Sequence, residues 1–526
     1  MSAYGHGKVL AIKVCPFQLI CHLVFFTTLI VMAIITKAII QSSALSRSVF
    51  VRSFSVSALR TQARPLDSEF PVLTDPLMEN KQLPSFMVGT ENGFLPRQEP
   101  LSQLPERFEK LESLLQRMPI RCRDGSPGLL AQGQFGDAVV AELPVYNVDD
   151  IHDNQLLSAL FRDYTFAASA YLLEPCDIMY RSKEDYGLGR QILPANIAVP
   201  LVKVSEKIHS KPFMEYALSY SLYNWKRLNP TAGLSYDNLD IVRGFAGSAS
   251  EAGFILNHVT MVAYSGDLVK HSLSVMDSVS NSNREQFNNS MRMLNRTYEF
   301  INNEMEMMWS RSEPGDYMKF RTFIMGTKNQ PMFPNGVVYE GVSDTPLFYR
   351  GESGANDSMV PLGDNLLQLT SHMPKNPLTE VLRDFRSYRP TNHKEFLEYV
   401  QERAEQVGVR DYALKDDNSA ALYLANVDQI RAFRHRHWNF TKSYIIKHTQ
   451  HAVATGGSPI TTWLPNQLGT VLDQMIQVGN TINRNNLTEE NQMALDAIWK
   501  RAEAQKRVLD REVATLKQAF KDQDKV

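Results

Sequence analysis

The chain has few cysteines and no excess of charge of either sign. Its 526 residues include four cysteines, and no two of them form a CxxC pair. Neither a disulfide framework nor a cysteine-bound zinc ion therefore explains the fold, and the composition fits a reducing compartment. Lysine and arginine together number 55 and aspartate and glutamate 57, so no basic field attracts nucleic acid, and we expect no nucleic-acid partner.

Acidic residues are absent from the first 66 residues. Residues 15–36 read CPFQLICHLVFFTTLIVMAIIT, an apolar run long enough as a helix to cross a hydrocarbon core of about 30 Å. Residues 37–66 combine many serines with five lysine or arginine residues, a composition typical of a mitochondrial transit peptide. We therefore interpret residues 1–66 as a leader and expect a mitochondrial location. The alternatives are a membrane anchor, a cytoplasmic protein or a misplaced start of the coding sequence.

Strand patterns are scarce after the leader. Only GVVYEGV (residues 336–342) and IAVPLVKV (residues 197–204) have features of short strands, whereas several longer segments have apolar positions three and four residues apart. Residues 67–133 are rich in proline and contain one expected helix, at residues 104–117. The sequence therefore predicts a mainly α fold.

The end of the chain, residues 486–526, has the pattern of a charged amphipathic helix. Its apolar face is formed by Ile498, Ala502, Leu509, Val513, Leu516 and Phe520. We expect this face to pack on the body of the protein and the charged face to meet water. A coiled-coil contact between subunits is the alternative, so the expected state is a monomer in which this helix remains a candidate contact.

Four of the 12 histidines lie in one segment, RAFRHRHWNFTKSYIIKHTQH, residues 431–451. Nothing in residues 428–447 breaks a helix. In a helix, one apolar face holds Ile430, Phe433, His437, Phe440 and Tyr444. His435 is rotated from His437 by about 200° and lies on the polar side, so both imidazoles cannot bind one metal from this helix.

Two interpretations of His437 follow from its place on the apolar face. A lone histidine among apolar residues is usually a core residue whose ring is satisfied by a hydrogen bond. Alternatively, one buried imidazole without a carboxylate or cysteine at metal spacing suits the axial position of a haem. A porphyrin supplies four nitrogens and needs only one axial group from the protein.

Three motifs in order resemble the indoleamine 2,3-dioxygenase family. They read NGVVYEGVSDTPLFYRGESGANDSMVPLGDNLLQL, DFRSYRPTNHKEFLEYV and FRHRHWNFTKSYIIKHTQHAVATGGSPITTWLPNQL, and the last is especially similar to fungal members. The resemblance covers residues 216–467 and implies a two-domain helical haem dioxygenase fold. The haem then lies between a smaller mixed N-terminal domain, residues 67–240, and a large all-α domain, residues 241–485, with residues 486–526 as an added C-terminal helix.

The resemblance also assigns the residues that hold the cofactor. It implies one haem b per chain, with His437 as the proximal ligand of the iron. Arg434, one helical turn earlier, reaches a haem propionate and is held by Asp364. Ser353 and Gly354 form a small-residue loop at the edge of the haem.

A second set of residues is implied to bind the substrate. Arg321 aligns with the arginine that pairs with the substrate carboxylate, through a bidentate geometry that suits a guanidinium. Thr455, in the TGG turn, reaches the polar end of the substrate. Phe254 and Tyr317 pack against the indole on the distal side of the haem, and Ser353 contacts it from the haem-edge loop.

The distal side also holds one ambiguous position and two departures from the family. His258 falls where it can hydrogen-bond the indole N–H or the bound oxygen, whereas an alignment shifted by one residue puts Asn257 there. Asp316 falls on a distal phenylalanine position, and Ala217 on a position that is often tyrosine. An anionic side chain near the indole would weaken apolar burial, which indicates a divergent subtype with low activity.

The implied reaction uses O2 to open the indole C2–C3 bond of L-tryptophan or a related indoleamine. The product is N-formylkynurenine, in the first step of the kynurenine pathway towards NAD, and an electron donor must first reduce the haem. One alternative is a haem-binding protein of the same fold with weak tryptophan activity, acting as a sensor or on another indole. Another is a helical interaction module without haem that uses the C-terminal helix.

Overall fold

The computed structural model describes residues 70–183, 185–369, 384–449, 453–458 and 460–523. The expected leader, with its alternatives, lies outside these ranges, as do the side chains of Leu516 and Phe520. Residues 69–526 form one compact unit, and the boundary expected near residue 240 stays a prediction. Within the described ranges, no helix combines the length and the apolar character that a membrane span requires.

The N-terminal third of the described chain packs short helices around one long helix. Its elements are η1 (Glu106–Phe108), α2 (Glu109–Arg117), α3 (Leu129–Gln132), α4 (Phe135–Glu142), α5 (Asn154–Lys183) and α6 (Ala195–Lys207). The helix expected at residues 104–117 starts only after Pro105, which precedes the 3-10 turn η1. The strand predicted for IAVPLVKV is wrong, because Ile197, Leu201 and Val204 form a buried helical stripe in α6.

The strands are short and form two small sheets. In the first, β1 (Ile192–Leu193) pairs in parallel with β4 (Val337–Tyr339), and β4 pairs antiparallel with β5 (Ser343–Leu347). In the second, β2 (Trp225–Arg227) pairs antiparallel with β3 (Leu239–Ile241). The strand expected in GVVYEGV is β4, and the prediction of a mainly α fold is confirmed.

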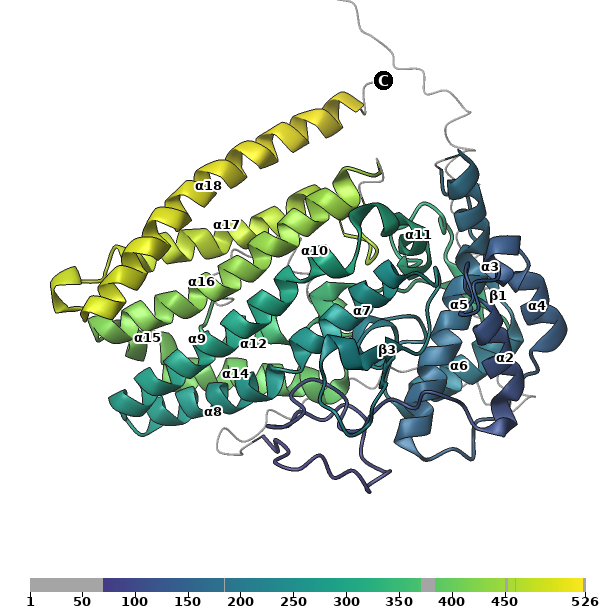
Figure 1. The fold of residues 1–526 in the computed structure, drawn as a ribbon, viewed down its shortest axis with the longest axis horizontal. Coiled ribbons are helices and arrows are strands. Elements are labelled where there is room, and N and C mark those ends of the chain that lie inside the picture. Colours follow the sequence, from purple (N-terminus) through teal and green to yellow (C-terminus); the bar gives the residue numbers. More distant parts are fainter. Residues whose placement is uncertain (1–69, 184, 370–383, 450–452, 459, 524–526) are drawn as a thin grey trace, which may run out of the picture. The chain divides into compact units, whose positions relative to one another are not determined.

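Helices dominate the rest of the chain. They are η2 (Tyr216–Tyr220), η3 (Tyr236–Asn238), α7 (Ala249–Val262), α8 (Ser265–Ser280), α9 (Arg284–Glu306), α10 (Met308–Arg311), η4 (Pro314–Asp316), α11 (Met318–Arg321), η5 (Thr322–Ile324), η6 (Gly354–Asn356), α12 (Met359–Leu366), α14 (Thr391–Val407), α15 (Val409–Leu414), α16 (Asp417–Phe440), η8 (Thr441–Ile446), α17 (Ile460–Gly479), η9 (Arg484–Asn486) and α18 (Glu489–Gln523). Among these, α16 packs against α9, α17 and α18 (Figure 1).

Particular residues determine where α16, the helix that carries the histidine cluster, begins and how closely it packs. The side chain of Asp416 caps α16 by accepting the Ser419 backbone N–H at 2.8 Å. Close packing against α12 requires Gly363, because a Cβ at that position would lie 2.5 Å from the Tyr298 hydroxyl and 2.7 Å from Ile430 Cδ1. The α-helix ends at Phe440 and continues as the π-helix η8, so the expected helix is continuous but changes its register.

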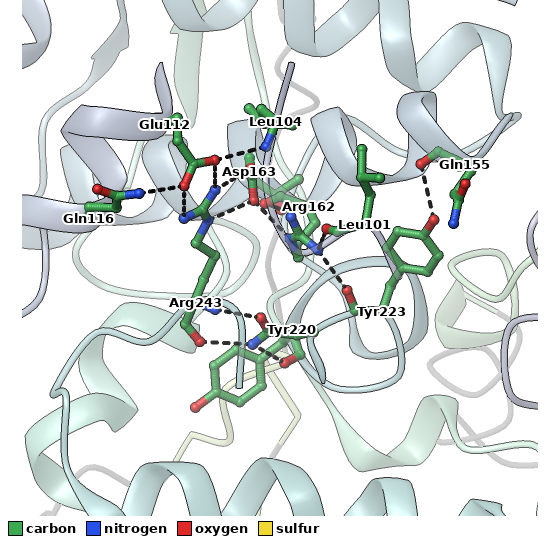
Figure 2. A network of polar contacts seen from close by, with 12 residues as sticks. Leu101, Leu104, Glu112, Gln116, Gln155, Arg162, Asp163, Tyr220, Tyr223 and Arg243 are labelled. Carbon is green, nitrogen blue, oxygen red and sulfur yellow. Dashed lines mark hydrogen bonds and ion pairs between the residues drawn. The ribbon is translucent and has the colours of Figure 1, made fainter. Parts of the chain in front are cut away.

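A buried ionic network ties the N-terminal helices to the body (Figure 2). Arg243, between β3 and α7, donates to both carboxyl oxygens of Glu112 on α2, at 2.9 and 2.6 Å. It also donates to Asp163 on α5 at 3.0 and 2.8 Å, and Arg162 donates to Asp163 at 2.7 Å. Burial favours the neutral carboxyl of Glu112, but Arg243 outweighs burial and lowers the pKa of that carboxyl. The network is therefore charged at neutral pH.

The C-terminal helix α18 packs along α17 and α16 (Figure 1). Ile498, Ala502 and Leu509 on its expected apolar face are buried. Glu512 accepts hydrogen bonds from Trp438 Nε1 at 2.9 Å and Lys442 Nζ at 2.8 Å. The helix therefore contacts the segment that follows His437.

Candidate functional site

One pocket collects most of the predicted site residues. It holds about 1210 Å³ of space free of protein atoms, part of which is open to solvent. The predicted residues on its wall are Phe254, His258, Tyr317, Ser353, Gly354, His437 and Thr455. Arg321, Arg434 and Asp364 do not line it. The wall combines α7, the loop before α12, the end of α16 and the TGG turn, which lie far apart in the sequence.

His437 lies in the last turn of α16 with its ring towards the pocket, which leaves the side chain half-buried. Its imidazole has no hydrogen-bond partner among the described residues, although a core histidine normally has one. Burial, supported by the nearby His258 and Arg434, lowers the pKa of His437 to about 4. The ring is therefore neutral at neutral pH, the form that ligates a metal.

Among the described residues, His437 belongs to no group of side chains that could hold a bare metal ion. No cluster of three or more histidine, cysteine, aspartate or glutamate residues able to hold a metal ion occurs in the described ranges. A single imidazole on a pocket wall suits the axial position of a haem, which brings its own four nitrogens. His435 instead faces away, where its Nε2 lies 3.2 Å from Asn439 Nδ2 and its ring near Glu512 of α18. The helix separates the two histidines as their spacing predicts.

Arg434 and Asp364 form a buried ion pair one helical turn before His437. Arg434 Nη2 donates to Asp364 Oδ2 at 2.6 Å, and both side chains are less than a tenth exposed. Arg434 Nε and Nη1 have no hydrogen-bond partner among the described residues. Two unpaired buried donors need an acceptor, because leaving them unsatisfied is costly. A haem propionate supplies such an acceptor, so the residues present fit a haem on this side.

Replacing Arg434 by methionine should weaken haem affinity about 10- to 100-fold, because a charge-assisted hydrogen bond contributes about 1.5–3 kcal/mol. The measurement is a titration of the protein with haem, followed by its Soret absorption. Arg436→Met is the matched control, since Arg436 lies on the same helix and binds Glu306 and Asn302 away from the pocket. Equal losses in both variants would show that Arg434 does not contact the haem.

The part of the pocket wall that α7 contributes is an aromatic cluster around His258. The ring of His258 lies 5.0 Å from that of Phe254 and 5.6 Å from that of Tyr216, and Phe254 lies 5.4 Å from Tyr317. His258 Nδ1 is 2.8 Å from the Phe254 carbonyl oxygen, which can only accept, so Nδ1 carries the proton. Burial lowers the pKa of His258, which keeps the ring neutral. Nε2 is then an acceptor and suits an indole N–H rather than bound oxygen.

Asn257, the alternative to His258, does not line the pocket. It is fully buried, and its Oδ1 accepts a hydrogen bond from Arg311 at 2.8 Å. One step along an α-helix turns a side chain by about 100°, which explains why only one of the two neighbours faces the pocket. Of the two aligned positions, the structure therefore brings His258 to the site.

Arg321 is fully buried behind the pocket wall. Its Nη1 donates to the Tyr186 hydroxyl at 3.1 Å and its Nη2 to the Val453 carbonyl oxygen at 2.9 Å, whereas Nε has no partner among the described residues. These partners must move before the guanidinium can take a carboxylate in bidentate form. Thr455 lines the pocket and donates its hydroxyl to the Glu352 carbonyl oxygen at 2.7 Å.

Asp316 and Ala217, the two departures from the family, do not lie on the pocket wall, although their aligned positions imply that they do. Asp316 does not line the pocket, because its carboxylate binds the Ser250 hydroxyl at 2.8 Å and Lys319 Nζ at 2.5 Å. Ala217 is buried in η2 off the pocket, and the neighbouring Tyr216 lines the wall. Both positions lie in 3-10 or π-helical turns, where a position aligned by counting residues does not predict which side chain faces the pocket.

Two acidic residues on the wall were missed by sequence reasoning. Glu352 and Asp357 line the pocket, and only 4% and 7% of their surfaces are exposed. Burial raises the pKa of Glu352 to about 8 and also raises the pKa of Asp357. Both lie in RGESGANDS, in which the resemblance assigns a role only to the small residues Ser353 and Gly354. The presence of two carboxyl groups in that loop was the feature of the sequence that could have indicated them.

Comparison with known proteins agrees with this geometry. Residues 82–492 match the family described as indoleamine 2,3-dioxygenase. Indoleamine 2,3-dioxygenase 1 of Mus musculus is 25% identical over 351 residues, which cover 66% of this chain and 81% of the relative. Indoleamine 2,3-dioxygenase nanC of Aspergillus nanangensis is 25% identical over 383 residues, covering 69% and 87%.

A third relative carries a different name. The protein named myoglobin from Haliotis diversicolor is 24% identical over 372 residues, which cover 70% of this chain and 90% of the relative. The family match nevertheless spans well over half of the sequence. The chain therefore belongs to the indoleamine 2,3-dioxygenase family.

Proposed function

We propose that the chain is a haem-dependent dioxygenase that adds O2 across the indole C2–C3 bond of L-tryptophan or a related indoleamine. With L-tryptophan the product is N-formylkynurenine. The observation that carries the proposal is the neutral imidazole of His437, which faces the pocket without a hydrogen-bond partner among the described residues. One haem b per chain, ligated by His437, accounts for that imidazole and for the unpaired donors of Arg434.

Each residue of the site has a separate task in this proposal. The haem supplies the iron that activates dioxygen once an electron donor has reduced it. Arg434, held by Asp364, fixes the cofactor through a propionate. Phe254 and Tyr317 pack against the indole ring and exclude water from it.

His258 orients the indole in this proposal. Its Nε2 accepts the indole N–H, because its Nδ1 proton is committed to the Phe254 carbonyl oxygen. This hydrogen bond orients the indole ring and so determines how its C2–C3 bond is presented for reaction. Arg321 takes the substrate carboxylate after its bond to Val453 opens.

Formation of N-formylkynurenine tests the proposal directly. The full-length chain is loaded with haem, reduced with ascorbate and methylene blue, and assayed against L-tryptophan concentration. We expect saturable product formation by the wild type and none by His437→Ala. Failure of the wild type to take up supplied haem would reject the proposal.

A second candidate function is haem binding without efficient tryptophan turnover, for sensing or for another indole. The similarity to a protein named myoglobin favours it, as do the acidic residues on the pocket wall. Haem uptake without N-formylkynurenine formation in the same assay would select this alternative.

We also propose that the protein acts as a monomer in mitochondria and feeds the kynurenine pathway towards NAD. The composition of residues 1–66 supports the location. A fusion of these residues to a fluorescent reporter tests it, and diffuse cytosolic fluorescence would contradict it.

A further inference from the structure

We propose that Glu352 binds the ammonium group of the substrate, so that the pocket recognises an indole compound by its amine more than by its carboxylate. The inference rests on the proposed dioxygenase function and adds the residue that recognises the amine of the substrate. It makes Glu352 a specificity-determining residue of the same site.

Glu352 is held by its backbone, which leaves its carboxyl group free for a ligand. Its N–H donates to the Ile324 carbonyl oxygen at 3.1 Å, and its own carbonyl oxygen accepts the Thr455 hydroxyl at 2.7 Å. Its carboxyl oxygens have no hydrogen-bond donor among the described residues, although only 4% of the residue is exposed. Buried carboxyl groups are normally paired, because burial without a partner is unfavourable. A ligand cation supplies the missing partner.

The side chains around the pocket favour an ammonium ligand over a carboxylate ligand. In the described part of the chain, no lysine or arginine lines the wall. Asp357 lines it as a second acidic residue, and its Oδ1 has no partner among the described residues. Arg321 lies behind the wall, bound to Tyr186 and Val453. An entering ammonium group therefore meets unpaired acceptors, whereas a carboxylate must first open the Arg321 contacts.

Glu352 lines the same pocket as the aromatic groups expected to hold the indole. Burial is the main cause of the raised pKa of Tyr317 and Tyr216, and the charge of Glu352 raises both further. Tyr317 packs on Phe254, and Tyr216 on His258. An indole against this cluster places a short side-chain amine within reach of Glu352.

The state of the Glu352 carboxyl gives the proposal a pH signature. Burial raises its pKa to about 8, so the group is mainly protonated at pH 7, and an ammonium ligand favours the ionised form. Amine affinity should then rise as the pH increases towards 8, by at most about tenfold per unit. The titratable groups that interact electrostatically with Glu352 are Glu215, Tyr216, Tyr220 and Tyr317. His258 and Asp357 line the same pocket.

Three indole probes test the proposal on the haem-loaded full-length chain. Tryptamine carries only the amine, indole-3-propionate only the carboxylate, and L-tryptophan both. Dissociation constants come from ligand-induced changes in the haem absorption spectrum, independently of turnover. We expect tryptamine to bind at least as tightly as L-tryptophan, and indole-3-propionate at least about tenfold more weakly, since a charge-assisted hydrogen bond is at stake.

The Glu352→Gln variant should weaken tryptamine about tenfold or more and abolish its pH dependence between pH 6 and 8, without weakening indole-3-propionate. Asp316→Asn is the matched control, because Asp316 binds Ser250 and Lys319 off the pocket and its loss should change none of the three constants. The ranking of probes by the wild type needs no variant. It therefore tests the proposal even if Glu352→Gln does not fold.

Two outcomes would overturn the inference while the dioxygenase function stands. One is equal affinity of the wild type for tryptamine and indole-3-propionate. The other is an equal loss of affinity for all three probes in Glu352→Gln. In both cases, N-formylkynurenine formation by the wild type separates this failure from a failure of the proposed function. Absence of haem uptake by the wild type would overturn both.

Discussion

Replacing His437 by alanine should abolish haem binding by the full-length chain, whereas replacing His435 by alanine should leave it nearly unchanged. His437 faces the pocket as a neutral ring without a hydrogen-bond partner among the described residues. His435 lies on the other side of α16, beside Asn439. Loss of an outer partner of a ligand already costs about 10–100-fold in metal affinity, so loss of the ligand itself should exceed this range.

The measurement is the Soret absorption of each variant during titration with haem, with circular dichroism as a check that the helices persist. Added imidazole should restore part of the Soret band of His437→Ala, because it can enter the space that the side chain leaves. The assignment of His437 would be wrong if His437→Ala bound haem as tightly as the wild type. It would also be wrong if His435→Ala lost the band in its place.

Replacing Arg243 by methionine should destabilise the protein by about 3–5 kcal/mol, because it leaves the buried Glu112 without its charged partner and the buried Asp163 with Arg162 alone. Figure 2 shows Arg243 between Glu112 and Asp163, and the side chains of all three residues are less than a tenth exposed. The matched control is Arg123→Met. Arg123 pairs with Asp240 at the surface, with 66% and 29% of the two side chains exposed, and such a pair contributes about 0–1 kcal/mol.

Urea unfolding at two pH values checks this prediction. In the wild type, Arg243 outweighs burial and lowers the pKa of Glu112, and the network likewise lowers the pKa of Asp163. The network therefore stabilises the fold above the ordinary carboxyl pKa, and this contribution is lost as the pH falls through the lowered values. The deficit of Arg243→Met should accordingly be largest near pH 7 and smaller near pH 4. A deficit equal to that of Arg123→Met, or one independent of pH, would contradict the prediction.

Helical periodicity was enough to predict which residues of α16 face the pocket. The spacing of Phe433, His437 and Phe440 gives one face of α16 in both the sequence and the structure. The ion pair between Arg434 and Asp364 followed from the resemblance to the family, since 70 residues separate the two positions. In a regular α-helix, residues three and four apart lie on the same face. The sequence spacing therefore predicts which side chains of α16 face the pocket.

The distal side could be predicted less well because its backbone is irregular. η2 is a π-helix and η4 a 3-10 turn. The aligned positions put Ala217 and Asp316 at the pocket, whereas the structure has Tyr216 on the wall in place of Ala217 and Asp316 off the wall, bound to Ser250. Glu352 lies in a loop, where no periodicity shows which way a side chain points. Strands of two to five residues are likewise too short to leave a period-two pattern.

The C-terminal helix was predicted as a packed amphipathic element and is found as one. The family match ends at residue 492, soon after α18 begins, so the packing of this helix could not come from the resemblance. Its contacts through Glu512 to Trp438 and Lys442 also could not be predicted, because they depend on how α18 crosses α16.

Labelled dioxygen gives the most direct test that this pocket adds both atoms of O2 to one indole. The haem-loaded, reduced chain is supplied with isotopically labelled dioxygen and with L-tryptophan or tryptamine, and the ring-opened product is analysed by mass spectrometry. We expect both labelled oxygen atoms in each product molecule formed by the wild type, and no product from His437→Ala. A product with a single labelled oxygen atom, or with oxygen taken from water, would contradict the proposed dioxygenase.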